Sequence, residues 1–170
     1  MNLFRDRMSS PIGTLLLIGD GDALLFLEFE DTGDRLYRAL ARLYPDATLS
    51  PGPVAGDATR GLAAYFDGDL AALNAIPVQP RGTSFQRHVW QALRQIPSGT
   101  TTTYGRLATS IGKPRATRAV GHANGANPIA IVIPCHRLIG ANANLTGYGG
   151  GLERKAWLLR HERAPVDPSL

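Results

Sequence analysis

The chain has 170 residues, 44% of them hydrophobic and 19% charged, which suits a soluble globular protein with one sizeable core or two small ones. No apolar run reaches the ~18 residues of a membrane span, and the N-terminus lacks a signal-peptide core, so we expect a cytoplasmic protein with no membrane partner. The net charge of +4 is unevenly divided. Residues 1–80 carry six arginines and eleven acidic residues, whereas residues 81–170 carry twelve basic and three acidic residues. The strongly basic second half indicates a polyanionic partner such as nucleic acid.

The first half of the chain has the pattern of a small α/β domain. Residues 12–18 and 23–30 are apolar, strand-like runs, and the Gly-Asp-Gly-Asp sequence at 19–22 between them is typical of a hairpin turn. Residues 34–44 have helical periodicity, and residues 61–66 predict a second, short helix. A stretch with two prolines at 74–82 marks the boundary, so we expect one domain over 1–80 and another over 81–170.

The second half is predicted to be mainly helical. Thr83 and Gln86 have the spacing of a capping box at the start of one helix. A second helix is expected to begin near Thr103, and a third to cover residues 115–124. The Gly-Lys-Pro turn at 112–114 between these two helices fits a helix-turn-helix, the motif of many DNA-binding proteins.

The last of these helices carries small residues where a major-groove reader has long polar ones. Small side chains let a helix approach the narrow minor groove closely and with low sequence specificity. They are equally typical of a helix packed tightly in the core, and the pattern by itself leaves both interpretations open. The residues concerned are Ala116, Ala119, Gly121 and Ala123.

Cys135 is the only cysteine, so an internal disulfide and a Cys-x-x-Cys site are both excluded. It follows residues 129–133, whose β-branched content predicts a buried strand, and it precedes His136. A thiol is nucleophilic as the thiolate, which a nearby base or cation favours. A lone cysteine after such a strand is otherwise a core residue, and adjacent strand side chains point to opposite faces, so adjacency does not establish that His136 activates it.

The segment Pro134-Cys135-His136-Arg137, with Asn127-Pro128 before it and Thr146-Gly147-Tyr148 after it, resembles the O6-alkylguanine-DNA alkyltransferase family (methylated-DNA–protein-cysteine methyltransferases). The resemblance covers roughly residues 83–162 and is looser before them. It implies an α+β chain: a small N-terminal α/β domain with an antiparallel sheet, ribonuclease H-like, and then a mainly helical, winged helix-turn-helix-like DNA-binding domain. Further matching motifs are Phe85-Gln86, Tyr104-Gly105, Arg118-Ala119-Val120-Gly121, Asn124-Gly125 and the stretch 155–162.

The resemblance implies DNA repair by one irreversible transfer of a methyl or other alkyl group from O6-alkylguanine, with O4-alkylthymine a possible second substrate. Cys135 would be the acceptor, and His136 would take its proton through a water. Glu162 would orient the imidazole, Tyr104 would donate to the guanine ring, and Asn127 would be a hinge. No cofactor is expected, because the sequence has no cofactor motif. With no second thiol either, Cys135 is not regenerated, since thiol exchange does not reverse a thioether.

The resemblance also implies a double-stranded DNA partner, bound by a monomer in the minor groove with the alkylated base flipped out. Arg118 would enter the duplex where that base has left it. Other expected DNA contacts are Arg115, Ala119, Gly121, Thr103, Tyr104 and Arg137, and the expected walls of the substrate pocket are Tyr148, Gly149, Gly150 and Lys155. No metal is expected, since residues 1–80 contain neither cysteine nor histidine for the zinc that some members bind.

Structural or non-specific roles for these residues also stay open. Tyr104 could be a core residue, Arg118 could contact a phosphate, Glu162 could pair with Arg160 or Arg163, and Asn127 could be a turn residue. Two other classes of function are alternatives. A helix-turn-helix transcription regulator is disfavoured by the small-residue helix, and a Cys-His hydrolase of small amides or esters is disfavoured by the basic half of the chain.

Overall fold

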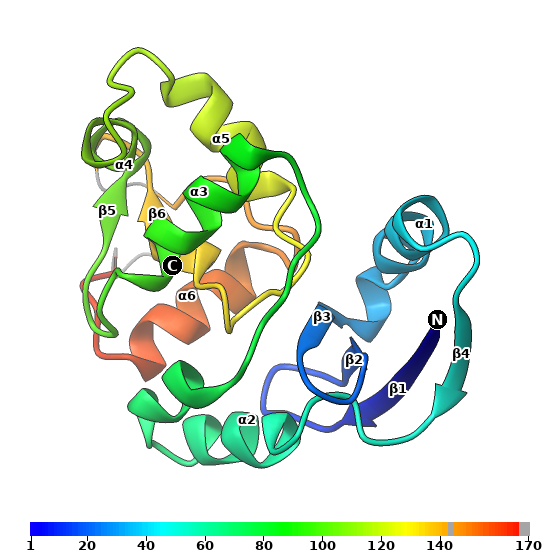
Figure 1. Cartoon of the computed structure of the whole chain (residues 1–170). Coiled ribbons are helices and arrows are strands. Elements are labelled where there is room, and N and C mark those ends of the chain that lie inside the picture. Colours follow the sequence, from blue (N-terminus) through cyan, green and yellow to red (C-terminus); the bar gives the residue numbers. More distant parts are fainter. Residues whose placement is uncertain (143–144, 167–170) are drawn as a thin grey trace. The chain divides into compact units, whose positions relative to one another are not determined.

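A computed structural model describes residues 1–142 and 145–166 of the chain (Figure 1). These residues form two compact units. The first comprises Met1–Arg81 together with Pro128–Val132, and the second comprises Gly82–Asn127 and the described residues from Ile133 onward. The prediction of a mixed α+β chain, with a sheet in the N-terminal half and helices in the C-terminal half, is confirmed. No helix of the described residues combines the length and the apolarity that crossing a membrane requires.

The first unit is built on a four-stranded sheet with the order β3-β2-β1-β4. The strands β2 (Leu15–Gly19) and β3 (Leu24–Phe29) are antiparallel, which confirms the predicted hairpin. Two strands were not predicted: β1 (Asn2–Met8), antiparallel to β2, and β4 (Thr48–Pro51), parallel to β1. The sheet is therefore mixed rather than purely antiparallel, because α1 (Asp34–Leu43) carries the chain across to the far edge of β1.

Helix α1 covers one face of this sheet with its apolar side. The core that results contains Leu3, Leu16, Ile18, Phe26, Leu36 and Tyr44. A short 3-10 helix, η1 (Glu30–Thr32), precedes α1, and α2 (Ala58–Phe66) and a second 3-10 helix, η2 (Leu70–Ala75), follow β4. Val78 and Ile129 extend the sheet at β3 through isolated parallel bridges to Leu24 and Leu27, so a segment distant in sequence completes this unit.

The second unit begins with α3 (Ser84–Arg94), where Thr83 and Gln86 form the predicted capping box. Next come the short strand β5 (Thr102–Thr103) and the helices α4 (Tyr104–Ser110) and α5 (Thr117–Gly125), near the predicted positions. The indole N–H of Trp90 in α3 donates to the carbonyl of Ala123 in α5 over 2.8 Å. This bond fixes α5 against α3, while α5 also packs on α4.

The segment before the cysteine is not the predicted strand. Residues 129–133 are all buried, but only Ile129 makes a ladder bridge, and Ile131 has a φ of 69°. A short apolar run indicates burial and does not distinguish a strand from a buried turn. The chain continues into a 3-10 helix, η3 (Cys135–Arg137), then β6 (Leu138–Ile139), which pairs with β5, and finally α6 (Leu152–His161).

Candidate active site

Cys135 is the first residue of η3 and is 7% exposed. Its backbone N–H donates to the carbonyl of Ile133 over 2.8 Å, which turns the chain sharply after the buried segment. His136 follows in the same 3-10 turn and is completely buried. Because the pair lies on a 3-10 turn and not on a strand, the two side chains are not forced to opposite faces of a sheet.

The imidazole of His136 is held by Glu162. Its Nε2 atom lies 2.8 Å from Glu162 Oε1, and both side chains are inaccessible to solvent. The other ring nitrogen, Nδ1, is buried and has no hydrogen-bond partner among the described residues. A histidine with one nitrogen anchored and the other without a partner has the arrangement of an oriented general base.

Glu162 is in turn held by Arg137. The guanidinium of Arg137 donates from Nε to Oε2 over 2.9 Å and from Nη2 to Oε1 over 2.8 Å. It also donates to the carbonyl of Ile96 and to the hydroxyl of Ser98. Arg137, which was predicted to contact DNA, is 5% exposed and its guanidinium donates to internal partners, so we do not include it in the DNA-binding surface proposed below. The carboxylate consequently belongs to a buried network of three residues, His136, Arg137 and Glu162.

The charges in this network are set by burial and by each other. Burial lowers the pKa of His136, an effect that the Glu162 carboxylate opposes and that Arg137 and Lys155 reinforce. Burial alone would raise the pKa of Glu162, but His136 and Arg137 outweigh it and lower that pKa. We therefore assign a neutral imidazole that donates its Nε2 hydrogen to an ionised carboxylate, which leaves Nδ1 able to accept a proton.

Lys155, on α6, is fully buried although it is charged. Its Nζ atom donates to the carbonyl of Thr146 over 2.6 Å and to that of Gly147 over 3.4 Å. Burial lowers its pKa to about 8, and the electrostatic interaction with Cys135 opposes this shift. Lys155 thus supports the loop that precedes α6 and places a positive charge within reach of the cysteine.

Asn127 and Tyr104 connect the helix-turn-helix to the same region. The amide Nδ2 of Asn127, just after α5, donates over 2.9 Å to the carbonyl of Ile133, which also accepts the Cys135 N–H. This bond ties the end of α5 to the chain two residues before the cysteine. The hydroxyl of Tyr104, the first residue of α4, accepts a hydrogen bond from Thr146 Oγ1 over 3.3 Å. Tyr104 is half-buried, so it is not a core residue.

The other predicted site residues fall into two groups. Tyr148 is half-buried, and its ring lies edge-on to His136 with 6.5 Å between centroids, whereas Gly149 is exposed and Gly150 half-buried.

The predicted DNA contacts Arg115, Arg118 and Ala119 are exposed, and Gly121 is half-buried. Thr103 caps α4 by accepting from the backbone N–H of Arg106. The structure therefore joins His136 to Glu162 and Asn127 to the segment before Cys135, and it leaves Arg115, Arg118 and Ala119 at the surface.

Thr146 belongs to the Thr-Gly-Tyr motif, but no role was predicted for it. Its side chain donates to Tyr104 and its carbonyl accepts from Lys155, so it links the two. Its place in the Thr-Gly-Tyr motif was the only signal available. Ser98 is a second residue with no predicted role. It accepts a hydrogen bond from Arg137, 39 residues away in sequence, and no motif in the sequence indicated this contact.

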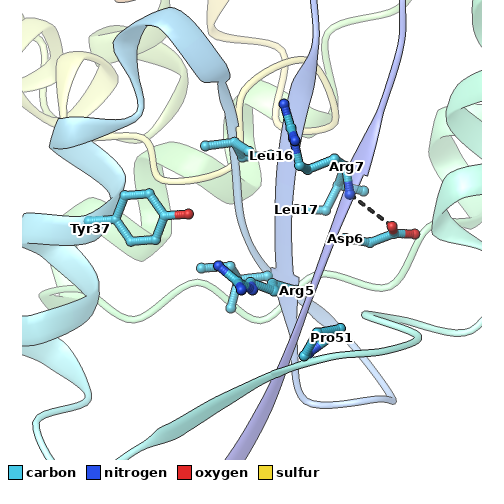
Figure 2. Close-up of a pocket in the computed structure, with 8 residues that line it drawn as sticks. Arg5, Asp6, Arg7, Leu16, Leu17, Tyr37 and Pro51 are labelled. Carbon is cyan, nitrogen blue, oxygen red and sulfur yellow. Dashed lines mark hydrogen bonds between the residues drawn. The ribbon is translucent and has the colours of Figure 1, made fainter.

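Two further features of the described residues concern ligands. No group of three or more His, Cys, Asp or Glu side chains in the described part of the chain is arranged to hold a metal ion. The first unit has a cavity of about 330 Å³ beside β1 and α1, and Tyr37 points across it toward the sheet (Figure 2). Its lining includes Arg5, Asp6, Arg7, Leu16, Leu17 and Pro51 and contains no predicted site residue.

Comparison with known proteins bears on both halves of the chain. Residues 3–80 match the family model of the 6-O-methylguanine DNA methyltransferase ribonuclease-like domain, and residues 84–164 match that of the DNA binding domain. A methylated-DNA–protein-cysteine methyltransferase of Mycobacterium tuberculosis is 47% identical over 169 residues, which cover 96% of this chain and 95% of that protein. The protein of the same name from Salmonella typhimurium is 45% identical, over 95% of this chain and 96% of its own length.

A solved structure is also similar. The crystal structure of M. tuberculosis OGT in complex with DNA superposes with a TM-score of 0.77 at 43% identity, covering 97% of this chain and 96% of that one. The agreement extends over both units of the chain.

Proposed function

The chain belongs to the 6-O-methylguanine DNA methyltransferase family, and from this membership we propose that it repairs DNA by moving an alkyl group from O6 of guanine onto Cys135. The observation that carries the proposal is the arrangement at η3. A nearly buried thiol is followed by a buried imidazole whose Nε2 is anchored by Glu162 and whose Nδ1 has no protein partner in the described chain.

In the proposed reaction, Sγ of Cys135 attacks the carbon bonded to O6. The S–C bond forms as the C–O6 bond breaks, and the electron pair of that bond stays on the guanine. Nδ1 of His136 takes the thiol proton through a water, and the Tyr104 hydroxyl donates to the ring as negative charge develops there. The products are a thioether and guanine, so the thiol proton is transferred to the base overall.

The network around His136 supports this role. Glu162 holds the imidazole in the tautomer that accepts a proton at Nδ1, and Arg137 keeps Glu162 ionised in a buried position. Lys155 contributes a positive charge that favours the thiolate, and it supports the loop with Tyr148, Gly149 and Gly150 that we propose as a pocket wall.

DNA is the macromolecular partner, as in the similar M. tuberculosis complex. We propose that a monomer binds double-stranded DNA in the minor groove, with Ala119 and Gly121 allowing close approach of α5. The exposed Arg118 would take the place of the flipped base, and Arg115 would contact phosphate. The hydrogen bond from Asn127 to Ile133 would then connect this helix to the reactive segment. We also propose that residues 1–80 and 81–170 act as separate domains.

Transfer would occur once per molecule, because the product is a thioether and Cys135 is the only thiol in the chain. The test is incubation of the whole protein with a duplex containing one O6-methylguanine, followed by intact mass spectrometry. The expected result is a mass gain of one CH2 group on Cys135, in a one-to-one ratio. The Cys135→Ser variant and an unmodified duplex are the controls. A folded, DNA-binding preparation that gains no mass would contradict the proposal.

A further inference from the structure

One polar side chain of the second unit is buried and has no assigned role. Asn124, near the end of α5, is 7% exposed, and its Oδ1 atom is buried with no hydrogen-bond partner among the described residues. A buried carbonyl without a partner is unfavourable in a folded protein, because it loses its bonds to water and gains nothing in return. Such an atom calls for an explanation, and a ligand that completes the bond is one.

The position of Asn124 in the hydrogen-bond pattern puts it next to the reactive segment. Its backbone carbonyl accepts from the N–H of Asn127 over 3.2 Å. The side chain of Asn127 donates to the Ile133 carbonyl, which also accepts the Cys135 N–H. Three hydrogen bonds thus connect Asn124 to the cysteine backbone.

Asn124 is also on the side of α5 that meets Tyr104. Gly121 precedes it by three residues, so the two share a helix face. A Cβ atom built on Gly121 would lie 3.7 Å from Cδ1 of Tyr104. The face with Asn124 therefore borders the proposed proton donor to the guanine ring and, at its end, the segment that holds the alkyl acceptor.

The chemistry of the lesion limits what this oxygen could bind. Alkylation at O6 removes the hydrogen from N1 of guanine, and N9 is bonded to the sugar, so the exocyclic 2-amino group is the only N–H donor that the base retains. Thymine alkylated at O4 has no such amino group and presents an acceptor, O2, instead.

We propose that Asn124 is a substrate-recognition residue whose Oδ1 accepts a hydrogen bond from the 2-amino group of the alkylated guanine. This inference rests on the proposed alkyl transfer and adds the residue that selects the base. It predicts slower reaction with O4-methylthymine, against which Oδ1 of Asn124 would face another acceptor.

The experiment compares single-turnover transfer rates on two duplexes that differ by one group: O6-methylguanine and O6-methylhypoxanthine, which lacks the 2-amino group. The unaltered protein should react roughly tenfold faster with O6-methylguanine, the size expected for one hydrogen bond to a buried group. Asn124→Leu removes the acceptor at similar volume and should react with both lesions at the slower rate. Asn124→Asp keeps an acceptor oxygen and should retain the preference.

His122→Ala is the matched control, since His122 is exposed on the same helix. It should keep the full preference for O6-methylguanine. Equal rates on the two lesions with the unaltered protein would overturn the inference, and so would an Asn124→Leu variant that keeps the preference. If Asn124→Leu does not fold, as judged by circular dichroism, Asn124→Ala is measured in its place. Absence of transfer to both lesions by the unaltered protein would instead contradict the proposed function.

Discussion

Oε1 of Glu162 accepts two hydrogen bonds, from Nε2 of His136 and from Nη2 of Arg137, each 2.8 Å long. The same atom thereby orients the proposed base and neutralises a buried guanidinium. Structure and reactivity are coupled at this carboxylate, so its removal should affect both.

Glu162→Gln is expected to lower both stability and rate. The neutral amide leaves Arg137 buried without a counter-charge, which should reduce the free energy of unfolding by about 3–5 kcal/mol. It also removes the charge that supports a protonated His136, so the transfer rate should fall roughly 10²- to 10⁴-fold. Denaturant unfolding and single-turnover transfer are the measurements. Glu153→Gln, an exposed carboxylate of α6, is the control and should change neither.

Stability should fall as the pH drops from 7.5 to 4. Burial lowers the pKa of His136, so below about 6.5 the unfolded chain binds a proton that the native chain does not. The lowered pKa of Glu162 has the same effect below about 4.3. Urea unfolding at pH 7.5, 5.5 and 4 tests both steps. His136→Asn should flatten the first step, whereas His88→Asn, an exposed site, should not. Equal stability at pH 7.5 and 5.5 would refute the assignment of a neutral imidazole.

Lys155→Met should make Cys135 less reactive. The substitution removes the charge that interacts with Cys135 and the donor to Thr146 and Gly147. We expect labelling of Cys135 by iodoacetamide to slow roughly tenfold at pH 7. Burial lowers the pKa of Lys155 to about 8, so the advantage of the unaltered protein should be present below pH 8 and fade above it. Lys113→Met, at an exposed site, is the control. A pH-independent ratio of the two rates would argue against an electrostatic role.

Arg118→Ala should impair the reaction only when the base must leave a duplex. Without a side chain to fill the space of the flipped nucleotide, transfer from O6-methylguanine in duplex DNA should slow roughly tenfold or more. The rate with the free base O6-benzylguanine should stay unchanged, because that substrate needs no flipping. Arg60→Ala removes an exposed arginine of the first unit and serves as the control. Equal losses on both substrates would indicate damage to the pocket.

Alkylation itself should destabilise the protein. Cys135 is 7% exposed, so an added alkyl group must be fitted into packed surroundings, at a cost of about 1–3 kcal/mol. The thermal midpoint should therefore fall by several degrees after reaction, and further for a benzyl than for a methyl group. Differential scanning calorimetry before and after stoichiometric transfer is the measurement. Identical midpoints would refute this expectation.

Local features of the chain could be predicted because their signals are local. The turn between β2 and β3, the capping box at Thr83 and the helix α1 each depend on residues within a few positions of one another. The strand β1 could not be predicted this way. Its sequence mixes Leu3 with exposed charges at Arg5 and Arg7, and only pairing with β2 and β4 on both edges stabilises it as a strand.

The sequence by itself determined that Cys135 is the only thiol, that His136 follows it, and that both lie in the basic half of a chain with the motifs of one family. The tertiary structure decided which partners these residues have. Arg137 turns inward to Glu162, 25 residues away, and residues 129–133 form a buried turn and not a strand. The physical reason is that apolar pattern and residue type report burial and chemistry, whereas the pairing of buried charges depends on which distant segments the fold brings together.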